Sequence, residues 1–162
     1  MIGNTGVRRR IQTIGALAGV LAASLSSSAV AGPRTAGIGT YITSVRFAHH
    51  AGFDRVVWTL HGPLPHHRVN YVRAVTADPS GRVVHLTGRA KLHVVFFSMS
   101  TSVTQPQGTW TPLDPEIRQV KGAGNFEGYT SYGVGLAAHR PFHVFTRTSP
   151  NRVILDVRHP RR

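Results

Sequence analysis

The sequence predicts an all-β fold, an antiparallel β-sandwich of about nine short strands, preceded by an N-terminal signal-peptide helix. From residue 40 onward, apolar and polar residues alternate with a period of two, which is typical of strands with one buried face. Clusters of Gly, Pro, Asp, Asn and Ser separate these runs at short intervals. No later stretch has apolar residues at helical spacing, so the crossover helices of a parallel sheet are missing.

The composition indicates one domain with a real core and no covalent cross-links. The chain has 162 residues, of which 41% are hydrophobic, and it has no cysteine. A chain of this length forms one domain and buries roughly two-thirds of its unfolded surface. The absence of cysteine excludes disulfides, thiolate zinc sites, cysteine nucleophiles and a lipid anchor on an N-terminal Cys.

The first 31 residues have the three-part pattern of a secretory signal peptide. Three arginines at 8–10 precede an apolar run at 14–25, and an A-x-A cleavage site follows at Ala29 and Ala31. The apolar run is shorter than the ~20 residues that span a bilayer, so we expect no transmembrane helix in the mature form. The paired arginines leave both Sec and twin-arginine export open.

We therefore expect a signal peptide at 1–31, a flexible lead-in at 32–39 and the β-domain at 40–159. The protein is expected to be secreted or held in the cell envelope after cleavage. The expected strands are 42–47, 55–60, 68–75, 82–86, 90–98, 117–120, 131–136, 142–146 and 152–157.

Two connections between these strands can be argued in detail. A three-residue loop at 87–89 joins 82–86 and 90–98 as a hairpin that pairs Val84 with Leu92, because this register keeps both side chains on the buried face. The segment 99–115 is long for a loop in a compact domain. It is either a functional loop or a disordered insertion, and the sequence leaves both open.

The charge balance points to an anionic partner. Nineteen Lys and Arg residues face six Asp and Glu residues, which gives a formal net charge of +13. A basic surface attracts nucleic acid, anionic lipid or acidic wall polymers. Export removes nucleic acid from the physiological partners, so a cell-wall polymer, either peptidoglycan or an anionic glycopolymer, is the expected ligand.

The contacts that we expect for such a polymer combine arginines with an exposed aromatic ring. Aromatic rings provide platforms for sugars, and arginine binds phosphate and carboxylate groups. Trp58 is expected in the core, whereas the rings of Trp110 and Tyr132 are expected to be exposed. The candidate binding residues are Arg55, Arg68, Arg73, Trp110 and Tyr132.

No catalytic apparatus, cofactor site or metal site is expected. The sequence has no G-x-S-x-G, S-x-x-K or P-loop motif, and no two of the six carboxylates form an evident acid–base pair. The ten histidines include two adjacent pairs, whose side chains point to opposite faces of an extended chain. Two alternatives remain: a metal-binding protein that uses His49, His66, His67 and His85, and a hydrolase that uses Asp54 or Glu127.

Several short motifs occur in a fixed order along the β-domain. They are GFDRVV at 52–57, RVNYV at 68–72, NFEG at 125–128, GVGL at 133–136, PFHV at 141–144 and RVILDV at 152–157. On these motifs the chain resembles the AMIN-like domain of exported actinobacterial proteins and lipoproteins, over about residues 40–159. The resemblance implies a relative of the AMIN domain, a β-sandwich that directs amidases and secretins to the cell envelope.

The resemblance supplies no catalytic residue. We interpret the motif residues as turn and core signatures; they are Gly52, Phe53, Asp54, Phe126, Glu127, Gly128, Gly135 and Asp156. Many relatives have a lipobox cysteine, and this chain lacks it. The sequence thus predicts an exported, non-catalytic domain that binds wall polymer. A secreted metal-binding protein and a scaffold for another exported protein are the alternatives, and the oligomeric state and the ligand stay open.

Overall fold

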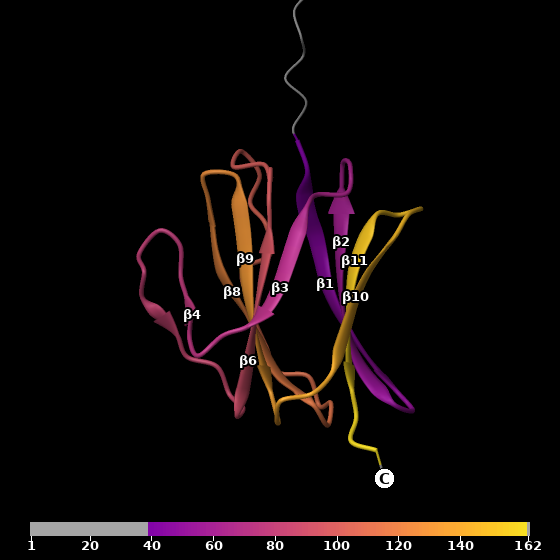
Figure 1. Cartoon of the computed structure of the whole chain (residues 1–162). Helices are drawn as coiled ribbons and strands as arrows, with labels where there is room; N and C mark the ends of the chain where they lie inside the picture. The colour runs from indigo at the N-terminus through magenta and orange to yellow at the C-terminus, as the bar shows by residue number, and fades with distance from the viewer. Residues whose placement is uncertain (1–38, 162) are drawn as a thin grey trace, which may run out of the picture. The chain divides into compact units, whose positions relative to one another are not determined.

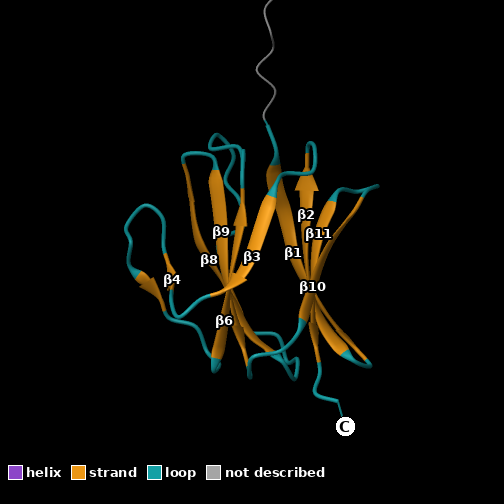
Figure 2. Cartoon of the chain, viewed as in Figure 1, coloured by secondary structure: helices purple, strands orange, loops and turns teal. Residues whose placement is uncertain are grey.

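A computed structural model describes residues 39–161, which form eleven β-strands and no helix (Figure 2). This confirms the predicted all-β fold. The predicted signal peptide and all but the last residue of the lead-in lie outside the described residues. None of the described segments forms an apolar helix of membrane-spanning length. The strands are β1 (Tyr41–His50), β2 (Phe53–His61), β3 (His67–Tyr71), β4 (Val75–Thr76), β5 (Val83–Val84), β6 (Ala90–Phe96), β7 (Thr109–Trp110), β8 (Ile117–Phe126), β9 (Tyr129–Leu136), β10 (Phe142–Arg147) and β11 (Arg152–Arg158).

Nine of the strands form two packed antiparallel sheets. One sheet has four strands in the order β1-β2-β11-β10, and the other has five in the order β3-β6-β9-β8-β7. Figure 1 shows the first sheet as the layer that combines the indigo N-terminal and the yellow C-terminal strands. β2 and β11, about a hundred residues apart in sequence, lie next to each other there, with Asp156 opposite Arg55.

The core between the sheets is built from the alternating side chains that the sequence predicted. Val56, Trp58 and Leu60 of β2 point inward and are buried. The ring of Trp58 contacts Phe96 and Tyr132, with centroids 5.7 Å from its own in both cases. Because these three residues come from both sheets, they join the two layers at the centre of the sandwich.

The predicted hairpin between 82–86 and 90–98 is wrong. Val84 pairs with Val75 in a separate two-stranded sheet of β4 and β5, and Leu92 pairs with Tyr71 and Val134. The segment around β4 and β5 instead packs on the outer side of β9, where Gly133 and Gly135 leave room for Leu86 and the Thr87 carbonyl. A Cβ atom at Gly133 would lie 2.6 Å from Leu86 Cδ1.

The segment 99–115 is an ordered part of the sandwich and not a disordered insertion. It contains the short strand β7, which pairs with β8 at Thr109 and Trp110. Gln105 is buried, and its side chain accepts a hydrogen bond from the Ile42 N–H (3.0 Å) and donates one to the Ser100 carbonyl (2.9 Å). The segment therefore covers the core between β1 and β8.

Candidate functional site

The outer face of the four-stranded sheet combines arginine with aromatic side chains. Residues directly opposite each other on adjacent antiparallel strands point to the same face. Because Val56 and Trp58 point inward, the neighbouring Arg55 and Val57 point outward, and the strand register extends this assignment across the sheet. We call this surface the basic aromatic face; its side chains include Arg46, His50, Phe53, Arg55, His143, Phe145, Arg147, Arg152, Ile154, Asp156 and Arg158.

Arg55 lies at the centre of this face and is held in one orientation. Its Nε and Nη2 donate to the two carboxylate oxygens of Asp156 at 2.7 and 2.8 Å. Its guanidinium lies 5.0 Å from the ring centroid of Phe53 and 5.4 Å from that of Phe145. The hydrogen bonds to Asp156 raise the pKa of Arg55 further, so this side chain stays charged.

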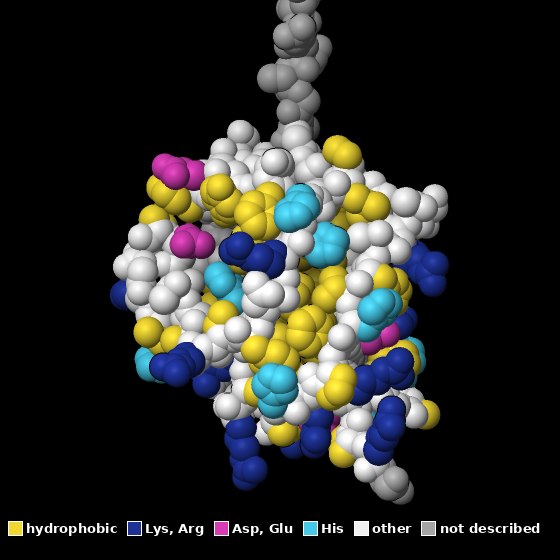
Figure 3. Space-filling view, in the orientation of Figure 1, with side chains coloured by type: hydrophobic (Ala, Val, Ile, Leu, Met, Phe, Trp, Pro, Cys, Tyr) yellow, Lys and Arg dark blue, Asp and Glu magenta, His cyan; other side chains and the backbone are white. Residues whose placement is uncertain are grey.

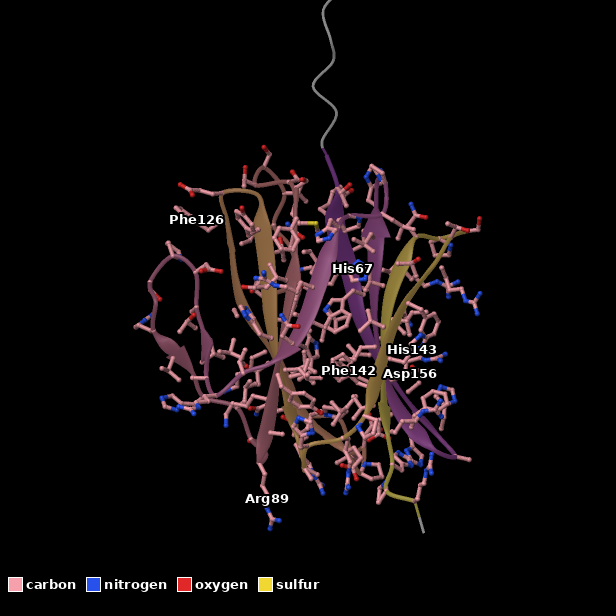
Figure 4. All side chains as sticks on the ribbon, viewed as in Figure 1. His67, Arg89, Phe126, Phe142, His143 and Asp156 are labelled. Carbon is pink, nitrogen blue, oxygen red and sulfur yellow. The ribbon has the colours of Figure 1, made fainter. Side chains whose placement is uncertain are left out.

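The two phenylalanine rings also contact other basic side chains. The guanidinium of Arg158 lies 5.9 Å from the Phe53 ring centroid, and that of Arg147 lies 5.5 Å from the Phe145 centroid. His50 stacks on Phe53 and His143 on Phe145, with centroids 4.5 and 5.2 Å apart. Figure 4 shows His143 and Asp156 together on the outer side of this layer, whereas Phe142 points into the sandwich.

The charge of the basic aromatic face is strongly positive. It holds five arginines and one carboxylate, that of Asp156, which is paired with Arg55. Within residues 39–161, no carboxylate forms an ion pair with Arg46, Arg147, Arg152 or Arg158. In the view of Figure 3, arginine and histidine side chains gather at the lower right, on the side of the four-stranded sheet. The face therefore presents several cations next to apolar rings.

The structure separates the arginines that the sequence analysis grouped. Arg55 lies on the basic aromatic face, whereas Arg68 points outward from β3 in the other sheet, with its guanidinium 5.7 Å from the Phe97 ring. Arg73 follows β3 in a loop, where it lines a hollow with Tyr71 and Arg89. The three arginines thus do not form one binding site.

The expectation that Tyr132 is exposed was wrong. Its side chain is fully buried against Trp58 and Phe96, and its hydroxyl donates to the Pro106 carbonyl at 2.7 Å. Burial raises the pKa of Tyr132. Trp110 is half-buried and packs against the core, with its ring near those of Phe47 and Tyr132. The aromatic rings next to Arg55 are instead Phe53 and Phe145.

A sequence signal for these two rings was present. Phe53 and Arg55, like Phe145 and Arg147, are separated by one residue, which places both members of each pair on the same side of a strand. The neighbouring buried residues then decide that this side is the outer one. The repeated F-x-R pattern could have located the basic aromatic face from the sequence.

The motif residues around β8 and β9 form a turn and a packing site. Glu127 and Gly128 connect these strands, and both have positive φ, 47° and 81°, as in a type I′ turn. Phe126 and Tyr129 pair on either side of the turn and are exposed. A Cβ atom at Gly135 would overlap the carbonyl oxygen of Thr87, so glycine permits the covering segment to approach β9.

The motif residue Asp54 lies at the start of β2 and is fully buried. Its Oδ1 accepts hydrogen bonds from His49 Nδ1 (2.8 Å) and His159 Nε2 (2.7 Å), and its Oδ2 accepts from the backbone N–H groups of Glu116 (2.6 Å) and Ile117 (3.1 Å). Burial favours a higher pKa, but these hydrogen bonds outweigh it and hold the pKa of Asp54 below its ordinary value. Asp54 is therefore an ionised acceptor.

The preceding Gly52 belongs to the turn between β1 and β2. Its N–H donates to the His50 carbonyl at 2.7 Å, and its own carbonyl accepts from the His159 N–H at 2.9 Å. The turn is thereby connected to the segment that follows β11. Gly52 has open space around its Cα, so close packing does not explain the glycine here.

The histidines of the metal-binding alternative do not gather in one place. Among residues 39–161, the group of potential metal ligands with converging atoms is His49, Asp54 and His159. His66 packs against the ring of Phe97, and His67 contacts Phe96. Of the four histidines considered from the sequence, His49 alone belongs to this group.

Comparison with known families gives one result. The family model of the AMIN-like domain matches residues 40–159, the span over which the sequence resembled that family. Searches among curated proteins and among solved structures return no match. The match covers the sandwich from β1 to the residue after β11, and the chain belongs to the AMIN-like domain family.

Proposed function

We propose that this protein is an exported, non-catalytic envelope domain whose basic aromatic face binds a polymer of the cell wall. The AMIN-like domain indicates an envelope-associated domain. The observation that supports wall polymer is that Arg147 and Arg158, which lie over the rings of Phe145 and Phe53, have no carboxylate partner among the described residues. The ligand is peptidoglycan or an anionic glycopolymer attached to it.

The chemistry of the face suits a chain of charged sugars. Arginine donates several hydrogen bonds to phosphate or carboxylate oxygens, and a flat apolar ring beside it can receive a sugar face. A sheet face has no deep cavity, so it fits a long polymer better than a small molecule. Of the two wall polymers, the unpaired positive charge favours the anionic glycopolymer.

Binding without catalysis is supported by the position of Asp54, one of the two carboxylates considered for hydrolysis. Asp54 is buried and accepts four hydrogen bonds, so it has no proton to donate. A general acid needs a raised pKa and access to substrate, and Asp54 meets neither condition.

The test is sedimentation of the mature domain with purified cell wall, with and without the anionic glycopolymer. One variant replaces three exposed arginines of the basic aromatic face by glutamine: Arg46, Arg147 and Arg158. The matched variant makes the same charge change elsewhere, at Arg68, Arg73 and Arg89. Loss of three exposed charge contacts should weaken binding by about tenfold, or roughly 1.4 kcal/mol, in the first variant.

The outcomes separate the proposal from a general effect of charge. Binding should weaken as salt rises, because exposed charges are screened, and it should fall when the glycopolymer is removed. If both variants lose the same amount of affinity for cell wall, the polymer is attracted by the general positive charge of the domain and not by the basic aromatic face. Recovery of the unmodified domain in the supernatant at low salt would overturn the proposed function.

A further inference from the structure

Three potential metal ligands converge at the end of the sandwich where β1 turns into β2. His49 comes from the end of β1, Asp54 from the start of β2, and His159 from the residue after β11. Their ligating atoms all lie within 4.8 Å of one another. His49 Nδ1 and His159 Nε2 both point at Asp54 Oδ1, and the two imidazole rings are stacked with centroids 5.1 Å apart.

The carboxylate of Asp54 is oriented as a metal-binding carboxylate usually is. Its Oδ2 is occupied by the N–H groups of Glu116 and Ile117, which fix the plane of the carboxylate from the opposite side. Its Oδ1 is left for the two imidazoles. Hydrogen bonds of this kind to the distal oxygen orient carboxylate ligands in metal sites and preserve one oxygen for the ion.

A second carboxylate adds negative charge beside this group. Asp114 is buried, and its Oδ2 has no hydrogen-bond partner among the described residues. Burial and the charge of Asp54 raise the pKa of Asp114, whereas His49 and His159 lower it, which places Asp114 in the electrostatic field of the cluster. A buried oxygen without a partner is costly, and a nearby cation would stabilise the carboxylate.

We propose that His49, Asp54 and His159 bind one divalent transition-metal ion, with zinc as the best match to two imidazole nitrogens and one carboxylate oxygen. Late first-row ions prefer this set of donors, and three protein ligands leave a fourth position open. The two histidines of the group border a hollow that is also lined by Gly52, Pro115, Glu116 and Pro160. The fourth position can therefore accept water or an oxygen of a ligand.

The ion replaces the protons that now lie between the ligands. The separations of 2.7 and 2.8 Å are hydrogen-bond distances, whereas tetrahedral zinc holds its ligands about 3.3 Å apart. To bind the ion, the imidazoles must release to solvent the N–H protons that point toward Asp54, and the two rings must move outward by about half an ångström. The side chain of His49 is 53% exposed and can make this movement, while Asp54 stays fixed by the backbone.

Calorimetric titration with zinc chloride tests the proposal on the chain purified without a histidine tag. We expect one ion per chain in the micromolar range or tighter, a rise in Tm with zinc, and the visible absorption of tetrahedral Co²⁺ when cobalt replaces zinc. His159→Gln and His49→Gln should each weaken binding by at least about tenfold, since each removes a ligand. His143→Gln, which changes an exposed histidine of the basic aromatic face, is the matched control and should bind like the unmodified chain.

The outcomes of this titration are independent of polymer binding. If His159→Gln and His143→Gln bind zinc with the same affinity, the proposed site is contradicted, because scattered surface histidines then hold the ion. If the folded, unmodified chain does not bind zinc, the proposal is also overturned. The three residues then serve only to connect β1, β2 and the segment after β11 by hydrogen bonds. The circular dichroism spectrum of each variant verifies that loss of binding is not loss of the fold.

Discussion

Arg55 and Asp156, which are 101 positions apart in the sequence, lie directly opposite each other on β2 and β11 and are joined by two parallel hydrogen bonds of 2.7 and 2.8 Å. The pair joins the two central strands of the four-stranded sheet. It also holds the guanidinium between Phe53 and Phe145. The same contact thus contributes to stability and arranges the basic aromatic face.

The two roles of this pair predict effects of opposite sign for Asp156→Asn. The substitution leaves Arg55 with a weaker, neutral partner, and the free energy of unfolding should fall by about 1–3 kcal/mol. It also removes the only carboxylate that faces these arginines on the described surface, so the affinity for an anionic wall polymer should rise. Urea denaturation and sedimentation with cell wall measure the two effects. A simultaneous loss of stability and affinity would contradict the assignment.

Gly135 should tolerate no larger side chain. A Cβ atom there overlaps the backbone oxygen of Thr87, so Gly135→Ala must push the covering segment away from β9. Overpacking of this kind should lower the free energy of unfolding by about 3 kcal/mol. Gly52→Ala is the matched control, since a Cβ atom at Gly52 would meet nothing within 4 Å, and it should be close to neutral. Similar Tm values for the two variants would contradict the packing argument.

The β8–β9 turn should be improved by asparagine. Glu127 has φ +47° and precedes Gly128 with φ +81°, and Asn-Gly is the preferred pair for this type I′ turn. Glu127→Asn should therefore raise the free energy of unfolding by about 0.5–1 kcal/mol. Glu127→Ala removes the same charge without favouring positive φ, so it should not stabilise. Thermal unfolding distinguishes the backbone effect from an effect of charge.

His93 should make the domain less stable in mild acid. Its Nε2 is buried and has no hydrogen-bond partner among the described residues. Burial lowers the pKa of His93, with Asp78 acting to raise it and Arg68 to lower it further. The unfolded chain therefore takes up the proton first as the pH falls below about 6.5, and stability that is present at higher pH is lost.

The measurement is the change in the free energy of unfolding between pH 7.5 and pH 5. His93→Gln cannot take up the proton and should show a smaller loss on acidification than the unmodified domain. His85→Gln is the control, because it replaces a histidine that is exposed. This variant should keep the pH dependence of the unmodified domain. Asp54, whose pKa is lowered from 3.8, contributes its pH dependence at lower pH and does not overlap this window. Identical pH profiles for the His93 variant and the unmodified domain would contradict the prediction.

Local alternation was sufficient to predict most of the strands, but it missed the short strand β7 and did not predict which strands pair. The inward set Val56, Trp58 and Leu60 follows from period two alone. The hairpin that paired Val84 with Leu92 also satisfied this rule, yet Val84 pairs with Val75. The segment around Val84 does not pair with Leu92 because it packs over the outer side of β9. This packing needs the glycines of β9, Gly133 and Gly135, which lie about 50 residues further along the chain.

The same distinction explains the candidate sites. The F-x-R patterns at Phe53 and Phe145 are visible in the sequence, but only the sheet order places both rings around Arg55. The expectation that the ring of Tyr132 is exposed was wrong. The inward positions of β9 alternate with glycines, and a glycine does not indicate whether its side of the strand is the polar or the apolar one. His159 gave no signal at all, since it meets His49 and Asp54 only when β11 pairs with β2.

The sequence by itself determined that this protein has a two-faced β-fold, a basic surface and membership of one family, because period, charge and ordered motifs are properties of the chain read locally. The tertiary structure alone decided which arginines share a face, which tyrosine is buried and that two histidines meet one aspartate. These facts depend on contacts between residues about a hundred positions apart, such as Arg55 with Asp156 and Asp54 with His159. Strand order brings such residues together, and no local pattern encodes it.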